Sequence, residues 1–399
     1  MDIVFNAEEL AFRDEVREFL ASKLPREIQE RTRLAPSYVP SDYTKRWQNI
    51  LYQQGWGAPN WALELGGTGW NAMQKYIYDA EYQAADCPRQ SPFGISMVGP
   101  VIGAFGTDAQ KEQHLGPIIR GEKQWCQGYS EPGSGSDLAS LATRAVPDGN
   151  DYVVNGSKIW TSHAHHADWI FCLVRTNTEV KKQEGISFLL IDMTTPGIIV
   201  KPIISIDGHH YLNEVFFDDV RVPISNRIGE ENKGWTYAKF LLGHERTGIA
   251  GVGKSKRKVE RLKKIASIER ADGASVLEQD SFRTRLSEAE VALQAVEFTQ
   301  LRILAQEKAG KPPGPEASTL KIGGTQVEQT LNELMIEAIG HYAAPYPADE
   351  LDPERNEPPI GPDYTVGLAQ ERLLRRAATI YGGSNEIQRG IIAKAVLEM

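Results

Sequence analysis

The residues best suited to chemistry stand in four short stretches, and the last of them reads Tyr381-Gly382-Gly383-Ser384-Asn385. Two adjacent glycines let the backbone approach a ligand with no Cβ in the way, and Ser384 and Asn385 are good N-cap residues for the helix expected next. The first N–H groups of a helix favour a negative or electron-rich group. Taken alone, the stretch predicts either such a contact or an ordinary turn into a terminal helix.

A second stretch, residues 241–251, places Glu245 and Arg246 next to each other in an apolar, glycine-containing run that is expected to be helical. One interpretation is an ordinary ion pair on a helix surface. The other is a general base, because a carboxylate in a poorly hydrated pocket has its pKa raised toward neutrality.

The third and fourth stretches are residues 125–138 and 158–162. After Glu131 the third is dominated by glycine and serine, which leaves backbone amides and hydroxyls free to hold a polar ring or a phosphate. The alternative is a plain entry loop of a β domain. Five histidines follow, and without companion carboxylates they favour polar positions on a β edge over a metal site, so no metal is expected: His163, His165, His166, His209 and His210.

Two changes in hydrophobic periodicity divide the chain into three segments. Residues 1–121 predict helices, the first of them opened by a capping box of Asn6 and Glu9 and ended by Pro25, with further helices at 43–55, 74–85, 99–106 and 107–121. The glycine-rich residues 55–70 between them are interpreted as a packed turn.

Residues 122–231 predict a compact antiparallel β domain. Asn155-Gly156 between β-prone runs is a strong signal for a tight hairpin turn. Further strands are expected at 169–174, 186–193, 198–203 and 212–222.

Residues 232–399 predict a C-terminal helical bundle. The basic run at 254–264 is expected to be a solvated helix face, with contact to phosphates as the alternative. A proline-rich, acidic insertion at 343–363 is long enough to be functional or mobile.

Composition excludes several classes of protein. The 399 residues suffice for two or three domains, and a dispersed net charge of −9 argues against nucleic acid or an anionic membrane as partner. Cys87, Cys126 and Cys172 have no pairing pattern and are expected to be reduced thiols. With no basic signal segment and no apolar run of the roughly 18 residues that a membrane span needs, a soluble cytoplasmic protein is expected.

Together the four stretches closely resemble the motifs of the acyl-CoA dehydrogenase family. With further matching segments, such as residues 56–69, 106–111 and 229–234, the resemblance covers most of the chain. The resemblance implies three domains, namely an N-terminal helical domain, a middle β domain and a C-terminal four-helix bundle, with FAD as cofactor. It implies that the isoalloxazine ring lies among Tyr129, Ser130, Trp160 and Ser162. It also implies that Ser384 and Glu386 bind the cofactor, and that Ser136 and Arg246 contact the acyl-CoA.

The position of the catalytic base is implied by a departure from the usual motif. In most of the family a glutamate at the place of Gly382 is the base, whereas in one branch, which includes isovaleryl-CoA dehydrogenase, the base stands on the helix that here carries Glu245. The resemblance therefore implies that Glu245 removes the α-proton and that the N–H of Gly382 still helps to hold the thioester oxygen. Hydride transfer needs a flavin, because no side chain accepts a hydride.

Other departures concern the cofactor site. The family's arginine-phenylalanine-glycine segment, which reaches a neighbouring subunit's flavin, is replaced by residues 269–273, and Glu337 and His341 stand where a glutamine and a glycine normally meet the adenosine. With the insertion, these changes make the chain most similar to pimeloyl-CoA dehydrogenase large subunits. They favour a homo- or hetero-oligomer, such as a dimer of dimers.

The expected reaction is oxidation of an acyl-CoA to a trans-2-enoyl-CoA, with electrons passed to electron-transferring flavoprotein. Two alternatives remain open. One is an oxidase or monooxygenase on the same fold, and the other is a non-catalytic subunit that completes the FAD site of a partner chain.

Overall fold

The computed structural model describes residues 5–308, 314–347, 349–352 and 355–398, without the side chains of 243–249 and 307–308. By its internal contacts the chain divides into two compact units. Unit 1 comprises residues 1–43, 70–88 and 246–399, and unit 2 comprises residues 44–69 and 89–245. The boundaries predicted for three sequence domains, 1–121, 122–231 and 232–399, stay a prediction.

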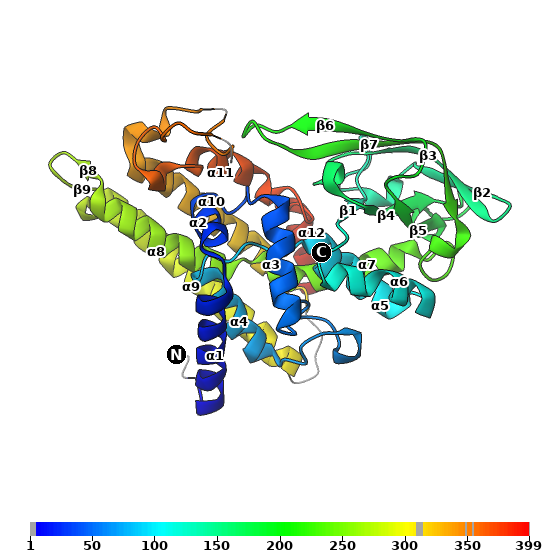
Figure 1. Cartoon of the computed structure of the whole chain (residues 1–399), viewed down its shortest axis with the longest axis horizontal. Helices are drawn as coiled ribbons and strands as arrows, with labels where there is room; N and C mark the ends of the chain where they lie inside the picture. The colour runs from blue at the N-terminus through cyan, green and yellow to red at the C-terminus, as the bar shows by residue number, and fades with distance from the viewer. Residues whose placement is uncertain (1–4, 309–313, 348, 353–354, 399) are drawn as a thin grey trace. The chain divides into compact units, whose positions relative to one another are not determined.

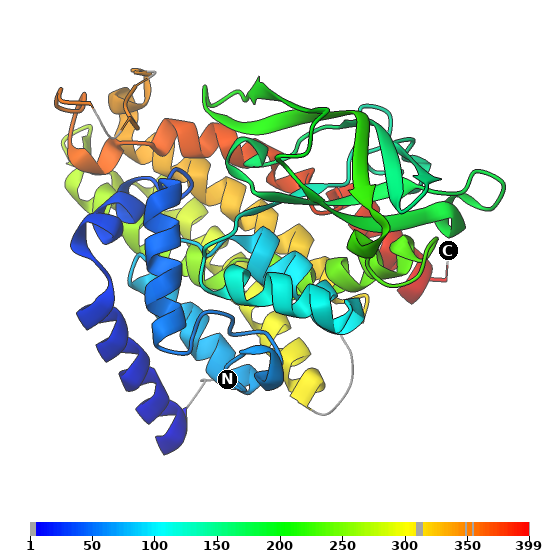
Figure 2. The same cartoon turned by 45° about the vertical axis from the view of Figure 1, so that its right-hand side comes forward.

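Unit 1 is helical, as predicted for both ends of the chain. Its long helices α9 and α10 lie alongside each other in both views of the chain (Figures 1 and 2), and α8 packs on α10. Its elements are α1 (Ala7–Lys23), α2 (Arg26–Leu34), α4 (Ala72–Ala84), α8 (Val252–Ile268), β8 (Arg270–Ala271), β9 (Ala274–Ser275), α9 (Asp280–Lys308), α10 (Ala317–Ile339), α11 (Leu368–Leu374) and α12 (Asn385–Val396).

The first residues of α1 were predicted correctly from a local capping pattern. Asn6 caps α1, and its side chain and that of Glu9 exchange hydrogen bonds of 2.9 Å with each other's backbone N–H, which confirms the predicted capping box. Phe12, Val16 and Leu20 then form the buried stripe of α1. Because such caps depend only on residues a turn apart, they can be recognised in a sequence without knowledge of the fold.

The prediction that the basic run of α8 is a solvated face holds for Lys256 and Lys264, which are exposed, and is wrong for its half-buried members. The Lys254 ammonium lies 2.5 Å from Glu328 of α10, and the Arg257 guanidinium lies 2.6 Å from the carboxylate of Asp86. Lys258 donates to the Asn332 side chain at 2.7 Å. These three basic side chains of α8 therefore meet acidic and amide groups of neighbouring segments.

The acidic partners in this bundle are buried as well. Burial would raise the pKa of Glu328, but Lys254, Arg375 and Lys258 outweigh that effect and lower it to about 2. Glu371 of α11 lies 2.8 Å from Arg375 and is 4% exposed. The network joins α8, α10 and α11, and it keeps these carboxylates ionised across the physiological pH range.

Unit 2 contains a seven-stranded sheet and the helices that cover it. Figure 2 shows the sheet with the long strand β7 crossing it. The elements are α3 (Ser41–Gln53), α5 (Gly99–Phe105), α6 (Asp108–Ile119), β1 (Trp125–Gly128), β2 (Arg144–Asp148), β3 (Asp151–Lys158), β4 (Trp169–Arg175), β5 (Ile186–Asp192), β6 (Ile198–Ile204), β7 (His210–Pro223) and α7 (Gly234–Ile249). The strands predicted at 169–174, 186–193, 198–203 and 212–222 correspond to β4 to β7.

The sheet is mixed, which corrects the prediction of an antiparallel domain. β1 pairs with β4 in parallel, with Trp125 opposite Trp169, whereas β3, β6 and β7 pair antiparallel. Parallel neighbours need a long connection, and β2, β3 and the following loop supply it between β1 and β4. The order along the sheet is β1-β4-β2-β3-β7-β6, with β5 pairing with β4 on its other side.

The predicted hairpin turn at Asn155-Gly156 is also wrong. β3 runs through both residues, and the register with β7 shifts there as a β-bulge. A Cβ on Gly156 would lie 2.7 Å from the Cα of Thr143, and its φ is +146°, so only glycine fits this crossing. The true hairpin lies between Asp148 and Asp151, which pair across a turn that contains Gly149.

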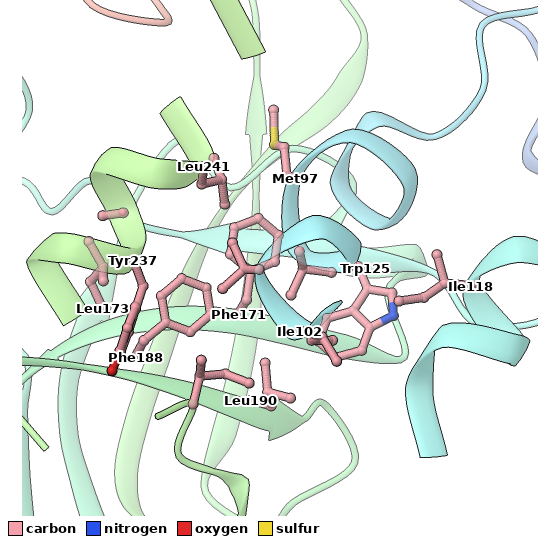
Figure 3. Close-up of a cluster of buried hydrophobic side chains, with 14 of the residues drawn as sticks. Met97, Ile102, Ile118, Trp125, Phe171, Leu173, Phe188, Leu190, Tyr237 and Leu241 are labelled. Carbon is pink, nitrogen blue, oxygen red and sulfur yellow. The ribbon is translucent and has the colours of Figure 1, made fainter. Parts of the chain in front are cut away.

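The sheet of unit 2 is buried on both faces of β4 and β5. Figure 3 shows one face, where Phe171 and Phe188 stack with their ring centroids 5.9 Å apart among side chains of α5, α6 and α7. On the other face, Ile170 and Leu189 join inward-facing residues of β3 and β7. This continuous apolar burial explains why β4 and β5 read as unbroken hydrophobic runs.

His114 of α6 provides a prediction about acid stability. Its side chain is 4% exposed and its ring meets the rings of Trp125 and Trp169 edge-on, at 5.2 and 4.7 Å. Burial lowers the pKa of His114 to about 4, below its ordinary value of 6.5. Between pH 6.5 and 4 the unfolded chain therefore binds a proton that the folded chain does not, and stability falls as the pH falls, by up to about 1.4 kcal/mol per pH unit.

We expect His114→Phe to lose less stability than the parent protein between pH 7 and pH 5. The measurement is the thermal unfolding midpoint across that range. His341→Phe replaces an exposed histidine and serves as the control. Equal pH slopes in the parent and in His114→Phe would show that His114 does not take up a proton on unfolding.

Candidate functional site

A buried ion pair joins the third and fourth sequence stretches. Lys158, the last residue of β3, is 0% exposed, and its ammonium lies 2.7 Å from the carboxylate of Glu131. The same carboxylate accepts hydrogen bonds from the backbone N–H groups of Ala142 at 2.6 Å and Thr143 at 2.9 Å. Burial opposes ionisation of Glu131, but Lys158 and these donors outweigh it, so the pKa of Glu131 lies below its usual value. Both charges are thus fully compensated.

This pair brings predicted cofactor residues together. The Lys158 ammonium also donates to the Tyr129 carbonyl at 3.3 Å, and the N–H of Ile159 donates to the Ser130 carbonyl at 2.9 Å. Tyr129–Ser130 and the chain entering Trp160 therefore run side by side. The Tyr129 ring, 6% exposed, packs edge-on against Phe171 at 5.8 Å.

Trp160 has an unusual conformation. Its φ of +60° lies in the left-handed region, which is unfavourable for a side chain of this size, and 56% of its surface is exposed. Next to it, Thr161 is 1% exposed, and its hydroxyl has no hydrogen-bond partner among the residues that the structure describes. An open aromatic face beside a buried, unpaired hydroxyl is what a polar aromatic ligand would complement.

The predicted substrate residue Ser136 lies in an exposed turn of unit 2. The turn begins with a two-way backbone pairing of Glu131 and Ser134, at 3.1 and 2.9 Å. The Ser136 side chain is exposed and forms no hydrogen bond with the residues that the structure describes, so its role stays a prediction.

Glu245 and Arg246 lie near the end of α7, but their side chains are outside the described part of the chain. What the structure describes is how the helix begins. A Cβ on Gly234 would lie 2.6 Å from the backbone of Ser187, so α7 starts in close contact with β5, and Leu241 anchors it in the core. The predicted base, Glu245, therefore lies on a helix whose first residue is held against β5.

In unit 1, the C-terminal turn has a backbone conformation that its two glycines permit. Gly382 and Gly383 have φ values of +66° and +78°, where only glycine is favoured. Ser384 caps α12 by accepting the Ile387 N–H at 3.3 Å. Glu386 is exposed and 3.5 Å from Arg389.

Asn385 plays a different part from the cap that the sequence suggested. It is 4% exposed, and its side-chain oxygen accepts a hydrogen bond of 2.9 Å from Lys321, which is itself 1% exposed. Burial lowers the pKa of Lys321 to about 8. No sequence signal marked Lys321, because its partner lies in a different helix and the spacing between them carries no pattern.

Residues that differ from the family's usual FAD-binding motif contact other residues of unit 1. Asp272 and Gly273, with φ values of +52° and +85°, form the two-residue turn of the β8–β9 hairpin. Glu337 forms an ion pair with Arg285 of α9. The carboxylate at this position is thus already engaged by an arginine of its own chain.

The insertion at 343–363 is anchored at its described part. Leu351 is 4% exposed and packs with Ala35 and Val366, and its carbonyl accepts a hydrogen bond of 2.5 Å from Arg31 of α2. Of the two alternatives for this segment, functional or mobile, the anchoring argues against free movement near Leu351.

Comparison with known proteins shows the family of the chain. The family descriptions "Acyl-CoA dehydrogenase, N-terminal domain", "middle domain" and "C-terminal domain" match residues 6–122, 126–220 and 232–397. The chain belongs to the acyl-CoA dehydrogenase family, a family of FAD-dependent oxidoreductases, and its cofactor is FAD.

Individual relatives match most or all of the chain. Acyl-CoA dehydrogenase IpdE1 of Mycobacterium tuberculosis is 35% identical over 390 residues, which cover 97% of this chain and 96% of the relative. Acyl-CoA dehydrogenase FadE29 of the same organism is 32% identical, covering 85% of this chain and 84% of the relative. Among solved structures, the Tcur3481-Tcur3483 steroid ACAD has a TM-score of 0.85 and 30% identity, covering 100% of this chain and 99% of that one. The ChsE4-ChsE5 complex from Mycobacterium tuberculosis has a TM-score of 0.82 and 30% identity, with the same coverage.

The residues of unit 2 fit the FAD ring system. The exposed indole of Trp160 offers a stacking face, and the unpaired Thr161 hydroxyl offers a hydrogen bond to a polar ring edge. Among the described residues no helix has the length and apolar character to span a membrane.

Proposed function

We propose that this chain oxidises the Cα–Cβ bond of an acyl-CoA thioester to a trans-2-enoyl-CoA and passes the electrons to electron-transferring flavoprotein. The observation that carries the proposal is the pairing of Tyr129–Ser130 with the chain entering Trp160, fastened by the buried Glu131–Lys158 pair. This pairing lies in a chain that matches the family from end to end.

The proposed roles follow the chemistry. Glu245 removes the α-proton of the thioester, since a carboxylate on an apolar helix holds a proton more tightly than one in water. The Gly382 N–H donates to the thioester oxygen, where negative charge develops as that proton leaves. Bound FAD supplies the hydride acceptor that no side chain can provide. Tyr129, Ser130, Trp160 and Ser162 bind the flavin ring.

The remaining assignments complete the proposed site. Ser384 and Glu386 contribute to cofactor binding, and Ser136 and Arg246 contact the acyl-CoA. We place the enzyme in the cytoplasm, which is supported by the three free, buried cysteines.

For the substrate, we propose a bulky acyl-CoA, such as a steroid-derived or carboxylated thioester. A solved relative is described as a steroid ACAD.

For the assembly, we propose a hetero-oligomer. Two solved relatives are pairs of different chains by their descriptions. In this chain Glu337 is engaged by Arg285, and the segment at 269–273 is a tight hairpin, so groups that a homo-oligomer would need from its own copies are missing. This observation also favours a second candidate, a subunit that completes the FAD site of a partner chain.

The test is the visible spectrum of the purified protein, recorded anaerobically before and after addition of a panel of acyl-CoAs. We expect one class of acyl-CoA to bleach a stoichiometric flavin band, and reoxidation by electron-transferring flavoprotein to be much faster than by oxygen. A flavin-loaded assembly that no acyl-CoA reduces would reject the dehydrogenase. Rapid oxygen consumption with substrate would indicate an oxidase instead.

A further inference from the structure

The loop that carries Trp160 and Ser162 is held in an unfavourable backbone conformation. Trp160 and His163 have φ values of +60° and +59°, and neither is a glycine. Residues in this region keep such a conformation only where their surroundings enforce it. Something beside the loop must therefore hold it.

The holding contacts come from β7. The Thr161 N–H donates to the backbone carbonyl of Asn213 at 3.0 Å, and the His163 N–H donates to the carbonyl of Tyr211 at 2.7 Å. In addition, the Asn213 side-chain amide donates to the Thr161 carbonyl at 2.9 Å. Asn213 thus holds both backbone polar groups of Thr161, the residue between Trp160 and Ser162.

The Asn213 side chain is shielded from bulk water. Asn213 is 0% exposed, although asparagine is ordinarily a surface residue. A buried carbonyl that loses its donor is left without a partner, which is costlier than losing an exposed hydrogen bond. The Thr161 carbonyl therefore depends on this one amide.

Two histidines set the direction in which the amide points. Its oxygen accepts from Nε2 of His210 at 2.8 Å, and its nitrogen lies 3.1 Å from Nδ1 of His165. The two imidazole rings stack, with centroids 4.0 Å apart. Because the Thr161 carbonyl only accepts, the amide nitrogen must face it, so His165 is the acceptor and His210 the donor.

We propose that Asn213 is a positioning residue for the flavin, acting through the Thr161 carbonyl to hold Trp160 and Ser162 in their binding conformation. The inference rests on the proposed function, which places these two residues against the flavin ring. Asn213 itself touches neither flavin nor substrate. The network of His165 and His210 keeps its amide in the one orientation that can serve this role.

Two variants and one control test the inference. Asn213→Asp keeps the shape but replaces the donor that faces the Thr161 carbonyl with an oxygen, and Asn213→Leu removes every polar contact. The control is Ser187→Ala on β5, which removes a hydroxyl that is equally buried and accepts the Asn232 N–H at 2.8 Å, away from the loop. FAD dissociation constant, visible flavin spectrum, flavin reduction rate at saturating acyl-CoA and unfolding midpoint are measured on the purified holoenzyme.

We expect both Asn213 variants to bind FAD about tenfold to a hundredfold more weakly, to show a shifted flavin spectrum and to reduce flavin more slowly, with little change in KM. Ser187→Ala is expected to lower the unfolding midpoint and to leave the FAD affinity and the flavin spectrum as in the parent protein; its reduction rate is not a control value, because Ser187 contacts the start of α7. If Asn213→Leu does not fold, Asn213→Asp decides. Parent-like FAD affinity, spectrum and reduction rate in Asn213→Asp would overturn the inference.

The outcome also separates this inference from the proposed function. If no acyl-CoA reduces the parent protein's flavin, the dehydrogenase assignment fails, while FAD affinity and spectrum still decide the role of Asn213. If the parent is reduced and the Asn213 variants equal Ser187→Ala in FAD affinity and flavin spectrum, only the positioning role is rejected.

Discussion

Replacing Glu245 by glutamine is expected to lower the rate of flavin reduction by acyl-CoA by about a thousandfold or more, with FAD still bound. Glutamine has nearly the same shape but cannot accept a proton, and a positioned general base contributes typically 10² to 10⁴ in rate. The KM should change little, because the proton is transferred only in the transition state. Anaerobic stopped-flow measurement of the flavin band at saturating substrate gives the rate directly.

A matched control for this variant is Glu230→Gln, which removes an exposed glutamate just before α7. It should reduce flavin at the parent rate. If Glu245→Gln also retains the parent rate, the base lies elsewhere, and Glu245 is the ordinary member of a helical ion pair that the sequence alone favoured. A colourless Glu245→Gln protein would point instead to a role in holding the assembly together.

Sequence reasoning succeeded where a structure depends on near neighbours. The capping box of Asn6 and Glu9 and the cap at Ser384 both follow from residues within one turn. β4 and β5 were recognisable because both faces are buried, so that neither strand alternates with polar residues.

It failed where a distant segment overrides the local signal. Asn155-Gly156 has the composition of a hairpin turn, yet Gly156 is required because Thr143 of the adjoining segment crosses it. The basic residues of α8 have the composition of a solvated face, but acidic partners come from α10 and α11 and from Asp86. No single window contains both members of these contacts.

The residues of the candidate site fall into the same two groups, those that a local motif marks and those that a distant segment supplies. The motifs located Tyr129, Ser130, Trp160 and Ser162, since each lies in a stretch with its own composition. The residues that hold those stretches are brought together from separate segments of the chain: Glu131 with Lys158, and His165 with Asn213 and His210 of β7. They become recognisable only when burial and hydrogen bonding are known.

Lys158→Met is expected to destabilise the protein by about 3–5 kcal/mol and to release FAD. The substitution keeps the apolar stem but leaves the Glu131 carboxylate buried without its cation, and removing one partner of a buried pair has a cost of this size. The Tyr129 carbonyl also loses its donor, so the loop beside Trp160 loosens. Thermal unfolding and the ratio of bound FAD to protein measure the two effects.

Two comparisons separate the buried pair from ion pairs in general. Arg120→Met breaks an exposed pair with Glu122, at 2.7 Å, and should have an effect of less than about 1 kcal/mol. The double variant Glu131→Gln with Lys158→Met should be more stable than Lys158→Met alone, because the uncompensated charge is gone. As the pKa of Glu131 is lowered on folding, its contribution is complete at neutral pH and is lost as the pH falls through that lowered pKa. If Lys158→Met were no less stable than Arg120→Met, the pair would not be what fastens Tyr129–Ser130 to the chain entering Trp160, and the flavin loop would depend on its contacts with β7 alone.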